Sequence, residues 1–225
     1  MLISVIIPVL NEASTLGLAL QNLDSLPGEK EVIVADGGSL DGTIAIAEKY
    51  ARVITSPRGR ALQMNAGAAA AKGEILLFLH ADTLLPPDAL PAMENRLKDA
   101  TVVGGRFRLR LDNPGWRYRM VGWSINTRDR IIGGFTGDQA IFVRTDVFNA
   151  LGGYAHIGLM EDLEIGRGMR RKGKVVRLQQ YATTSARRWE RGGGLKTVFL
   201  MGVLRTLYYL KFPPSRMQRW YNDAR

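Results

Sequence analysis

Residues 31–43 read EVIVADGGSLDGT, an apolar run that ends in a carboxylate, two glycines and a polar turn. The same plan occurs twice more, because the run at 2–7 leads into PVLNE at 8–12 and the run at 74–79 into HADT. Segments between these runs repeat apolar residues at helical spacing, at about 14–25, 42–51 and 60–72. Strands alternating with helices predict an α/β fold, with a mostly parallel sheet and helices on both faces.

The second half of the sequence is less regular. Apolar runs predict strands at 102–109, 139–143 and 174–178. Residues 161–172 and about 195–211 have helical patterns, and 115–132 fits either a helix or a mobile insertion.

Composition limits the class of protein. The chain has 225 residues and a net charge of +10, and residues 166–225 hold 15 Lys/Arg against 2 Asp/Glu. A basic surface of this kind attracts phosphates, nucleic acid or an acidic membrane, and the charge alone does not choose among them. The absence of cysteine excludes disulfides and thiolate metal sites and is compatible with the cytoplasm. The N-terminal apolar run predicts a strand and not a signal peptide, and no run is long enough to suggest a membrane span.

Ligands of such sheets bind beyond the carboxyl ends of the strands, so the polar turns there are the candidate site. Asp82 could hold Mg²⁺ or Mn²⁺ against a diphosphate, or it could cap a turn before Pro86. Asp36 could accept hydrogen bonds from a nucleobase or a ribose, and Gly38 would let the backbone approach the ligand. Arg60, which begins a predicted helix, could bind an anion or a base edge or lie in a solvated turn.

Two later segments also carry candidate chemistry. Glu161 and Asp162 begin a predicted helix, where acids favour the helix dipole, but a carboxylate there could also act as a general base. The segment at 185–194, which contains Arg188 and Trp189, could be a mobile lid over a phosphate, a solvated basic loop or a nucleic-acid contact.

Together these segments resemble glycosyltransferase family 2, whose members have the GT-A fold. The resemblance covers residues 2 to about 194 and implies one domain at 1–194, with a nucleotide-sugar half at about 1–109, an acceptor half at about 110–194 and a C-terminal helical extension at 195–225. It implies that Asp82 binds the metal and that Asp162, assisted by Glu161, is the catalytic base. The residues it implies for nucleotide-sugar binding are Pro8, Asn11, Glu12, Asp36, Gly38, Arg60, Asn65, His80, Ala81, Arg188 and Trp189.

One position departs from the family pattern. The metal motif of the family is usually Asp-x-Asp, whereas this chain has His80 at the first position. His80 could bind the sugar of the nucleotide or fill space, and metal affinity would fall. The segments around His80 and Trp189 also resemble a bacterial subgroup of transferases associated with radical-SAM, selenium-linked and arsenosugar genes.

The leading functional hypothesis is inverting transfer from a nucleoside diphosphate sugar, uridine-linked, to a hydroxyl of a small or lipid-linked acceptor. A nucleotidyltransferase is the first alternative, but the turn at 8–12 lacks the glycine and the basic side chain, Arg or Lys, that such an enzyme needs. A non-catalytic module for nucleic acid or membranes is the second, and no RNA-binding motif supports nucleic acid as a partner.

The final apolar helix, with charges at Lys196, Arg205 and Lys211, has two interpretations. It could pack on the catalytic domain or on a second subunit of a homo-oligomer. It could instead contact the inner face of the cytoplasmic membrane, near a lipid-linked acceptor. The expected location is therefore cytoplasmic, with peripheral membrane contact as the second interpretation.

Overall fold

The computed structural model describes residues 1–132, 134–192, 194–214, 216–217 and 220. The strands in this part of the chain are β1 (Ile3–Val9), β2 (Lys30–Asp36), β3 (Arg52–Thr55), β4 (Ile75–Phe78), β5 (Thr83–Leu84), β6 (Val102–Leu111), β7 (Ile141–Arg144) and β8 (Lys174–Thr184). The helices are α1 (Ala13–Ser25), α2 (Thr43–Ala47), α3 (Arg60–Ala70), α4 (Ala89–Leu97), α5 (Trp116–Ile132), the 3-10 helix η1 (Gly137–Gln139), α6 (Thr145–Ala150), α7 (Glu161–Lys172), α8 (Arg187–Gly192) and α9 (Gly194–Tyr209).

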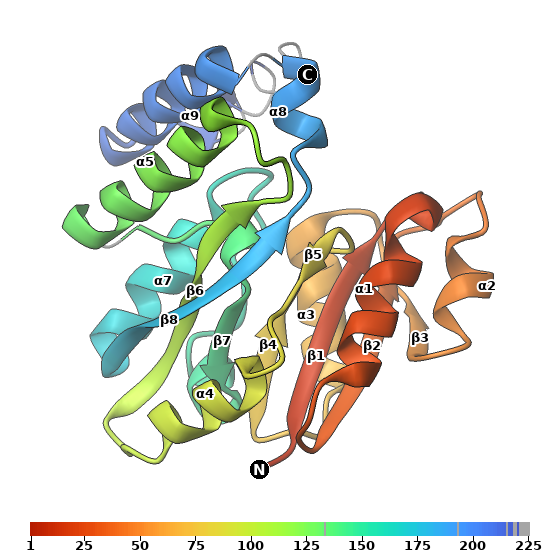
Figure 1. The fold of residues 1–225 in the computed structure, drawn as a ribbon. Coiled ribbons are helices and arrows are strands. Elements are labelled where there is room, and N and C mark those ends of the chain that lie inside the picture. The colour runs from red at the N-terminus through yellow and green to blue at the C-terminus, as the bar shows by residue number, and fades with distance from the viewer. Residues whose placement is uncertain (133, 193, 215, 218–219, 221–225) are drawn as a thin grey trace.

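The strands form a sheet with the order β3-β2-β1-β4-β7-β6-β8-β5 (Figure 1). In its first half β1 pairs in parallel with β2 and β4, and β2 pairs in parallel with β3. Val9 pairs with Asp36, and Ile6 pairs with Phe78. The carboxyl ends of β1, β2 and β4 therefore reach the same edge of the sheet, where the polar turns begin.

The second half of the sheet mixes directions. Strand β7 is antiparallel to β4 and β6, β6 runs parallel to β8, and β5 is antiparallel to β8. Parallel pairings remain the majority, so the predicted mostly parallel α/β sheet is confirmed. Strand β8 is longer than predicted because it continues to Thr184, where it pairs with β5.

Two hydrophobic cores lie on opposite faces of the sheet, as alternation along a buried strand requires. Val5 and Ile7 of β1 belong to the core shared with α1 and α4, whereas Ile6 belongs to the core shared with α3, α6 and α7. Helix α3 lies very close to β1, because a Cβ added to Gly67 would come within 2.4 Å of the Ile6 side chain. This packing holds the start of α3, at Arg60, near the edge that carries the turns.

Two further helices lie side by side at one end of the sheet. Residues 116–132 form helix α5 and not a mobile insertion, and α9 packs beside α5 (Figure 1). Leu204 of α9 is fully buried in a small core with Leu159, Met160 and Leu163. Within the part of the chain that the structure describes, no helix is long and apolar enough to cross a bilayer.

Helix α4 was not predicted from the sequence. Two prolines precede it and Pro91 lies inside it, which masks a helical pattern. Pro91 is the third residue of α4, in the first turn, where the missing N–H costs no intrahelical hydrogen bond.

Candidate active site

The turns after β1 and β2 are tied together by short polar contacts. The Asp36 carboxylate accepts hydrogen bonds from the backbone N–H groups of Gly38 at 2.9 Å and Ser39 at 3.1 Å. The Asn11 side-chain oxygen accepts one from Leu40 N–H at 2.8 Å, and Glu12 N–H donates to the Thr43 hydroxyl at 2.8 Å. Asn11 has φ +56° and Gly38 has φ +94°, so both turns use left-handed backbone. The structure thus brings together, in the two adjacent turns, four residues that were predicted to bind the nucleotide sugar.

Gln63 holds the ends of the two strands below those turns. Its buried side-chain NH₂ donates to the carbonyl oxygens of Val9 at 2.7 Å and Ala35 at 2.8 Å. These acceptors lie where β1 and β2 end and the chain turns, and the Val9 carbonyl also accepts a hydrogen bond from the Gly37 N–H at 3.0 Å. Gln63 is a positioning residue that sequence reasoning missed, because a single amide in a helix carries no signal of its partners.

Asp82, the predicted metal ligand, lies beside Glu12 and helix α8. One Asp82 oxygen accepts a hydrogen bond from the Thr184 hydroxyl at 3.3 Å, and the other is 3.6 Å from the Arg187 guanidinium. Arg187 is also 3.5 Å from the Glu12 carboxylate. Arg187 therefore bridges two acids that follow different strands.

The residues present fit a hard divalent cation. No group of three or more His, Cys, Asp or Glu side chains converges on a metal position among the described residues. A cation bridged by diphosphate oxygens and water needs only one or two protein carboxylates, however, and Asp82 supplies one on a partly exposed side chain.

A small cavity lies between the end of β4 and the start of α7. Its lining includes Pro8, Arg60, His80, Glu161 and Asp162. His80 Nδ1 is 3.0 Å from an oxygen of Asp138, so the ring is oriented by η1. Glu161 is buried and lies 3.7 Å from the Arg60 guanidinium. The cavity thus joins residues predicted for donor binding to the two predicted catalytic acids.

Asp162 is held in place by two backbone N–H groups. Its Oδ2 accepts a hydrogen bond from Gly137 at 3.0 Å and its Oδ1 accepts one from Leu163 at 2.8 Å. Burial and the neighbouring Glu161 raise the pKa of Asp162 to about 6, while Arg205, the Gly137 N–H and Arg60 act in the opposite direction. A carboxylate with this pKa is ionised at neutral pH and is still basic enough to accept a proton.

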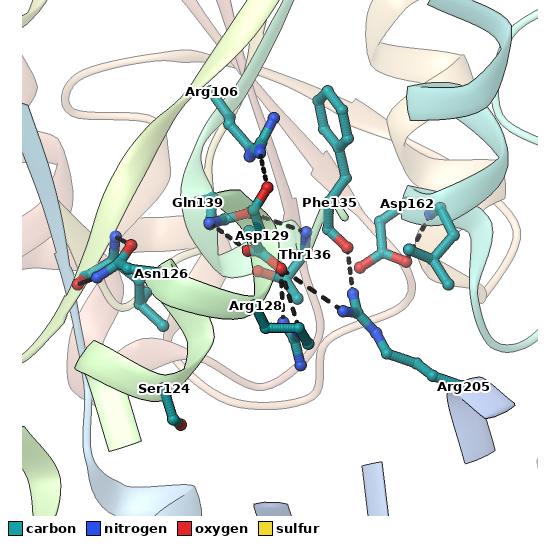
Figure 2. Close-up of polar contacts among 12 residues, drawn as sticks. Arg106, Ser124, Asn126, Arg128, Asp129, Phe135, Thr136, Gln139, Asp162 and Arg205 are labelled. Carbon is teal, nitrogen blue, oxygen red and sulfur yellow. Dashed lines mark hydrogen bonds and ion pairs between the residues drawn. The ribbon is translucent and has the colours of Figure 1, made fainter. Parts of the chain in front are cut away.

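A buried network behind Asp162 connects it to helices α5 and α9 (Figure 2). Its centre is Asp129 of α5, whose carboxylate accepts a hydrogen bond from Gln139 at 2.7 Å and pairs with Arg128 at 2.9 Å. Arg205 of α9 lies 3.7 Å from the same carboxylate and donates a hydrogen bond to the Phe135 carbonyl. Arg205 therefore anchors the segment that carries Gly137, the donor to Asp162.

The same network contains more cations than anions. Arg106 of β6 donates to the Asp129 carbonyl at 3.0 Å and stacks over the Phe135 ring at 4.5 Å. Burial lowers the pKa of Arg106 to about 10, although the charge of Asp129 partly compensates. The carboxylates of Asp129 and Asp162 offset part of this positive charge, since both favour the charged form of Arg205. The sequence offered only one hint, a lone arginine in the otherwise apolar final helix.

Several predicted site residues have other contacts. The Asn65 side-chain amide donates a hydrogen bond to the Tyr154 carbonyl at 2.9 Å and accepts one from the Tyr154 N–H at 2.8 Å. These two bonds hold α3 against the segment that contains Tyr154. The segment predicted as a mobile lid is helix α8, and Trp189 is buried in a cluster with Leu109, Val121 and Ile125. The buried Ala81 belongs to a hydrophobic core.

The Arg188 side chain lies outside the described residues. Arg187, its neighbour, pairs with Asp82 and Glu12, contacts that were not predicted from the sequence.

Comparison with known proteins agrees with this geometry. The family model described as Glycosyl transferase family 2 matches residues 4–151. The chain belongs to this family. The match spans the paired turns and Asp82, and it ends before the helix that carries Asp162.

Individual relatives are more distant. An undecaprenyl-phosphate 4-deoxy-4-formamido-L-arabinose transferase from Aeromonas hydrophila is 32% identical over 126 residues, which are 50% of this chain and 39% of that protein. The chain thus spans about two fifths of the length of that relative.

Solved structures share the fold. S. aureus TarS 1-349 has a TM-score of 0.67 at 19% identity, covering 83% of this chain and 61% of that one. Glucosyl-3-phosphoglycerate synthase from Mycobacterium tuberculosis, solved with Mn²⁺, UDP and glucosyl-3-phosphoglycerate, has a TM-score of 0.59 at 21% identity, covering 81% and 70%. The GT-A architecture expected from the sequence is therefore confirmed.

Proposed function

We propose that this chain is an inverting glycosyltransferase that moves a sugar from a nucleoside diphosphate sugar, uridine-linked, to an acceptor hydroxyl. The observation that carries the proposal is Asp162: its carboxylate lines the cavity, is fixed by the Gly137 N–H and has a raised pKa. A single carboxylate base opposite a donor-binding turn is the arrangement that a one-step displacement requires.

On the donor side, the two adjacent turns supply the binding groups. Asp36 and Asn11 would contact the base or ribose by exchanging their present backbone partners for ligand groups, and Arg60, which lines the cavity with Pro8 and His80, would add a positive charge. One S. aureus TarS structure was solved in complex with UDP-GlcNAc, which supports a uridine-linked donor. His80, fixed by Asp138, would contact the nucleotide's sugar.

Asp82 would hold Mg²⁺ or Mn²⁺ against the donor diphosphate. When bound, the ion would neutralise charge on the departing diphosphate. The chain's own contribution there is Arg187, whose guanidinium already lies within 3.6 Å of Asp82 and adds a second positive charge near the leaving group.

On the acceptor side, Asp162 would take the proton of the attacking hydroxyl as that oxygen bonds to the sugar carbon. Burial, and after it like-charge repulsion from Glu161, raises the pKa of Asp162, which strengthens it as a base. Arg205 and the Gly137 N–H oppose this effect and keep the carboxylate ionised near neutral pH.

A lipid phosphate is the second candidate acceptor, because the Aeromonas relative is named for undecaprenyl phosphate. The two acceptors make different demands on Asp162. A phosphate oxygen is already anionic and needs no base, whereas a hydroxyl does. In either case we place the reaction in the cytoplasm, at the inner face of the membrane when the acceptor is a lipid. The resemblance to the radical-SAM-associated subgroup is also a proposal and names no acceptor.

Purified protein tests the proposal in two steps. Thermal shift with a panel of nucleotide sugars, with and without Mn²⁺, should show stabilisation by a uridine-linked donor that grows with its concentration. Transfer assays with the identified donor should then release nucleoside diphosphate, whereas pyrophosphate release would mean nucleotidyl transfer and contradict the proposal.

The variant Asp162→Asn separates the acceptor classes. We expect it to bind donor normally and to lose transfer to a hydroxyl by a factor of about 10² or more. Retained transfer to a lipid phosphate by this variant would replace the hydroxyl hypothesis with the phosphate one.

A further inference from the structure

Helix α5 presents a line of large apolar side chains to solvent. Trp116, Trp123 and Ile131 are 62–76% exposed, and Met120 lies between them. Spacings of four, seven and fifteen residues from Trp116 place these side chains on one face of the helix. The opposite face of α5 packs normally, because Val121 and Ile125 are buried in a cluster with Trp189. The exposed line is therefore additional to what the fold needs.

Helix α9, beside α5, repeats the pattern. Phe199 and Leu210 are 74% and 73% exposed, and Val203 lies on the same face at 39%. Leu204 and Arg205, on the other side of α9, are buried. The two helices lie side by side at the same end of the molecule (Figure 1), and each has exposed apolar side chains.

The charges around these faces are mostly basic, although Asp112 and Glu190 lie exposed near the start of α5. Arg117, Arg119 and Arg130 of α5 are exposed, and the acid of this helix, Asp129, is buried in the network with Arg128 and Arg205. Beyond α9, Lys211 and Arg216 are exposed, and the sequence has no acid between Glu190 and Asp223. A second copy of the same face would bring these like charges together, which disfavours self-association.

An apolar stripe with two tryptophans on α5, beside a second apolar stripe on α9 and with mostly basic neighbours, matches the surface of an anionic bilayer. Tryptophan rings favour the level of the lipid headgroups, aliphatic side chains enter the acyl boundary, and arginines reach the phosphates. We propose that the α5–α9 face, defined by Trp116, Met120, Trp123, Ile131, Phe199, Val203 and Leu210, docks on an anionic membrane surface.

Docking in this way would bring the bilayer close to the proposed base. Arg205 leaves α9 towards Asp129 and Phe135, on a different side of the helix from Phe199 and Leu210. The membrane would therefore lie about one helix diameter, roughly 10 Å, from the Asp162 network. This inference deepens the proposed lipid-linked acceptor, but membrane binding can be measured without any transfer, so each can fail alone.

Vesicle flotation of the full chain tests the surface. We expect binding to vesicles of about 70% phosphatidylcholine and 30% phosphatidylglycerol, and at least about tenfold weaker binding to pure phosphatidylcholine, since each basic residue near an anionic surface contributes roughly fivefold. The double variant Trp116→Glu/Trp123→Glu should reduce binding to the anionic vesicles at least about tenfold. Leu18→Glu, on the 65% exposed Leu18 of α1, is the matched control and should bind like the parent chain.

Two further measurements distinguish membrane docking from misfolding and from insertion by other tryptophans. Circular dichroism establishes that the double variant is folded, and quenching of tryptophan fluorescence by brominated lipids should fall in that variant and not in the control. The proposal is overturned if the parent chain stays with the lipid-free fraction, if the double variant floats like the parent, or if light scattering shows a dimer that the double substitution dissolves.

Discussion

Asp162→Asn should change the pH dependence of folding stability as well as the activity. Asp162 has a folded pKa of about 6 against an ordinary value of 3.8. Because the folded pKa is the higher one, the protonated carboxyl stabilises the fold below about pH 4, and this contribution is lost as pH rises through about 6. A difference of about two pKa units corresponds to about 3 kcal/mol. Residual contact of the side chain with solvent reduces the expected effect to about 1–2 kcal/mol.

The asparagine variant has no such titration. It keeps one acceptor oxygen for the two N–H groups of Gly137 and Leu163, which costs about 1 kcal/mol at every pH. The difference in unfolding free energy, variant minus parent, should therefore rise by about 1–2 kcal/mol between about pH 4 and pH 8. Urea unfolding at a series of pH values across this range measures it. Asp146→Asn, an exposed acid in the first turn of α6, gives the baseline for removing one surface carboxylate. A difference that stays constant within about 0.5 kcal/mol would refute the assigned environment of Asp162.

Three other predictions follow from the contacts of the site. Arg205→Gln should lower kcat by about tenfold and move the acid limb of the pH–rate profile to higher pH, because the arginine favours ionised Asp162. The control variant Arg171→Gln, on the exposed side of α7, should leave the acid limb in place. Asp82→Asn should abolish the extra thermal stabilisation that Mn²⁺ gives with a nucleotide sugar while the metal-free shift persists, and an unchanged Mn²⁺ effect would move the metal elsewhere. Asn65→Ala should lower the unfolding free energy by about 1–3 kcal/mol in urea, because two backbone groups of Tyr154 lose their partner, and a loss below about 0.5 kcal/mol would contradict that role.

Much of the donor half could be predicted because its signals are local. Each polar turn directly follows an apolar strand, so the sequence itself places Asp36 and Asp82 at strand ends, and parallel pairing brings those ends to one edge. Family resemblance then gave the roles. Helix α4 was not predicted because proline normally argues against a helix. Pro91 is compatible with this helix only because it lies in the first turn.

The network behind Asp162 could not be predicted in the same way. Asp129, Gln139 and Arg205 lie on three elements, and no sequence pattern links residues whose partners are set by tertiary packing. The burial of Trp189 was missed for a related reason. A basic-aromatic segment next to glycines reads as exposed, whereas Trp189 finds a pocket between β6 and α5 that only the folded chain creates.

The position of Arg205 has a consequence for how this enzyme could be altered by selection or by design. Helix α9 offers one side to the surroundings and directs Arg205, on its other side, towards the Asp162 region, so replacing the helix would also change the environment of the proposed base. A shortened chain ending before α9 would keep the whole family match and still lose the guanidinium that holds the Phe135 segment. If the proposed docking holds, substitutions of the outward residues of α9 would change affinity for the bilayer and leave the surroundings of Asp162 unchanged.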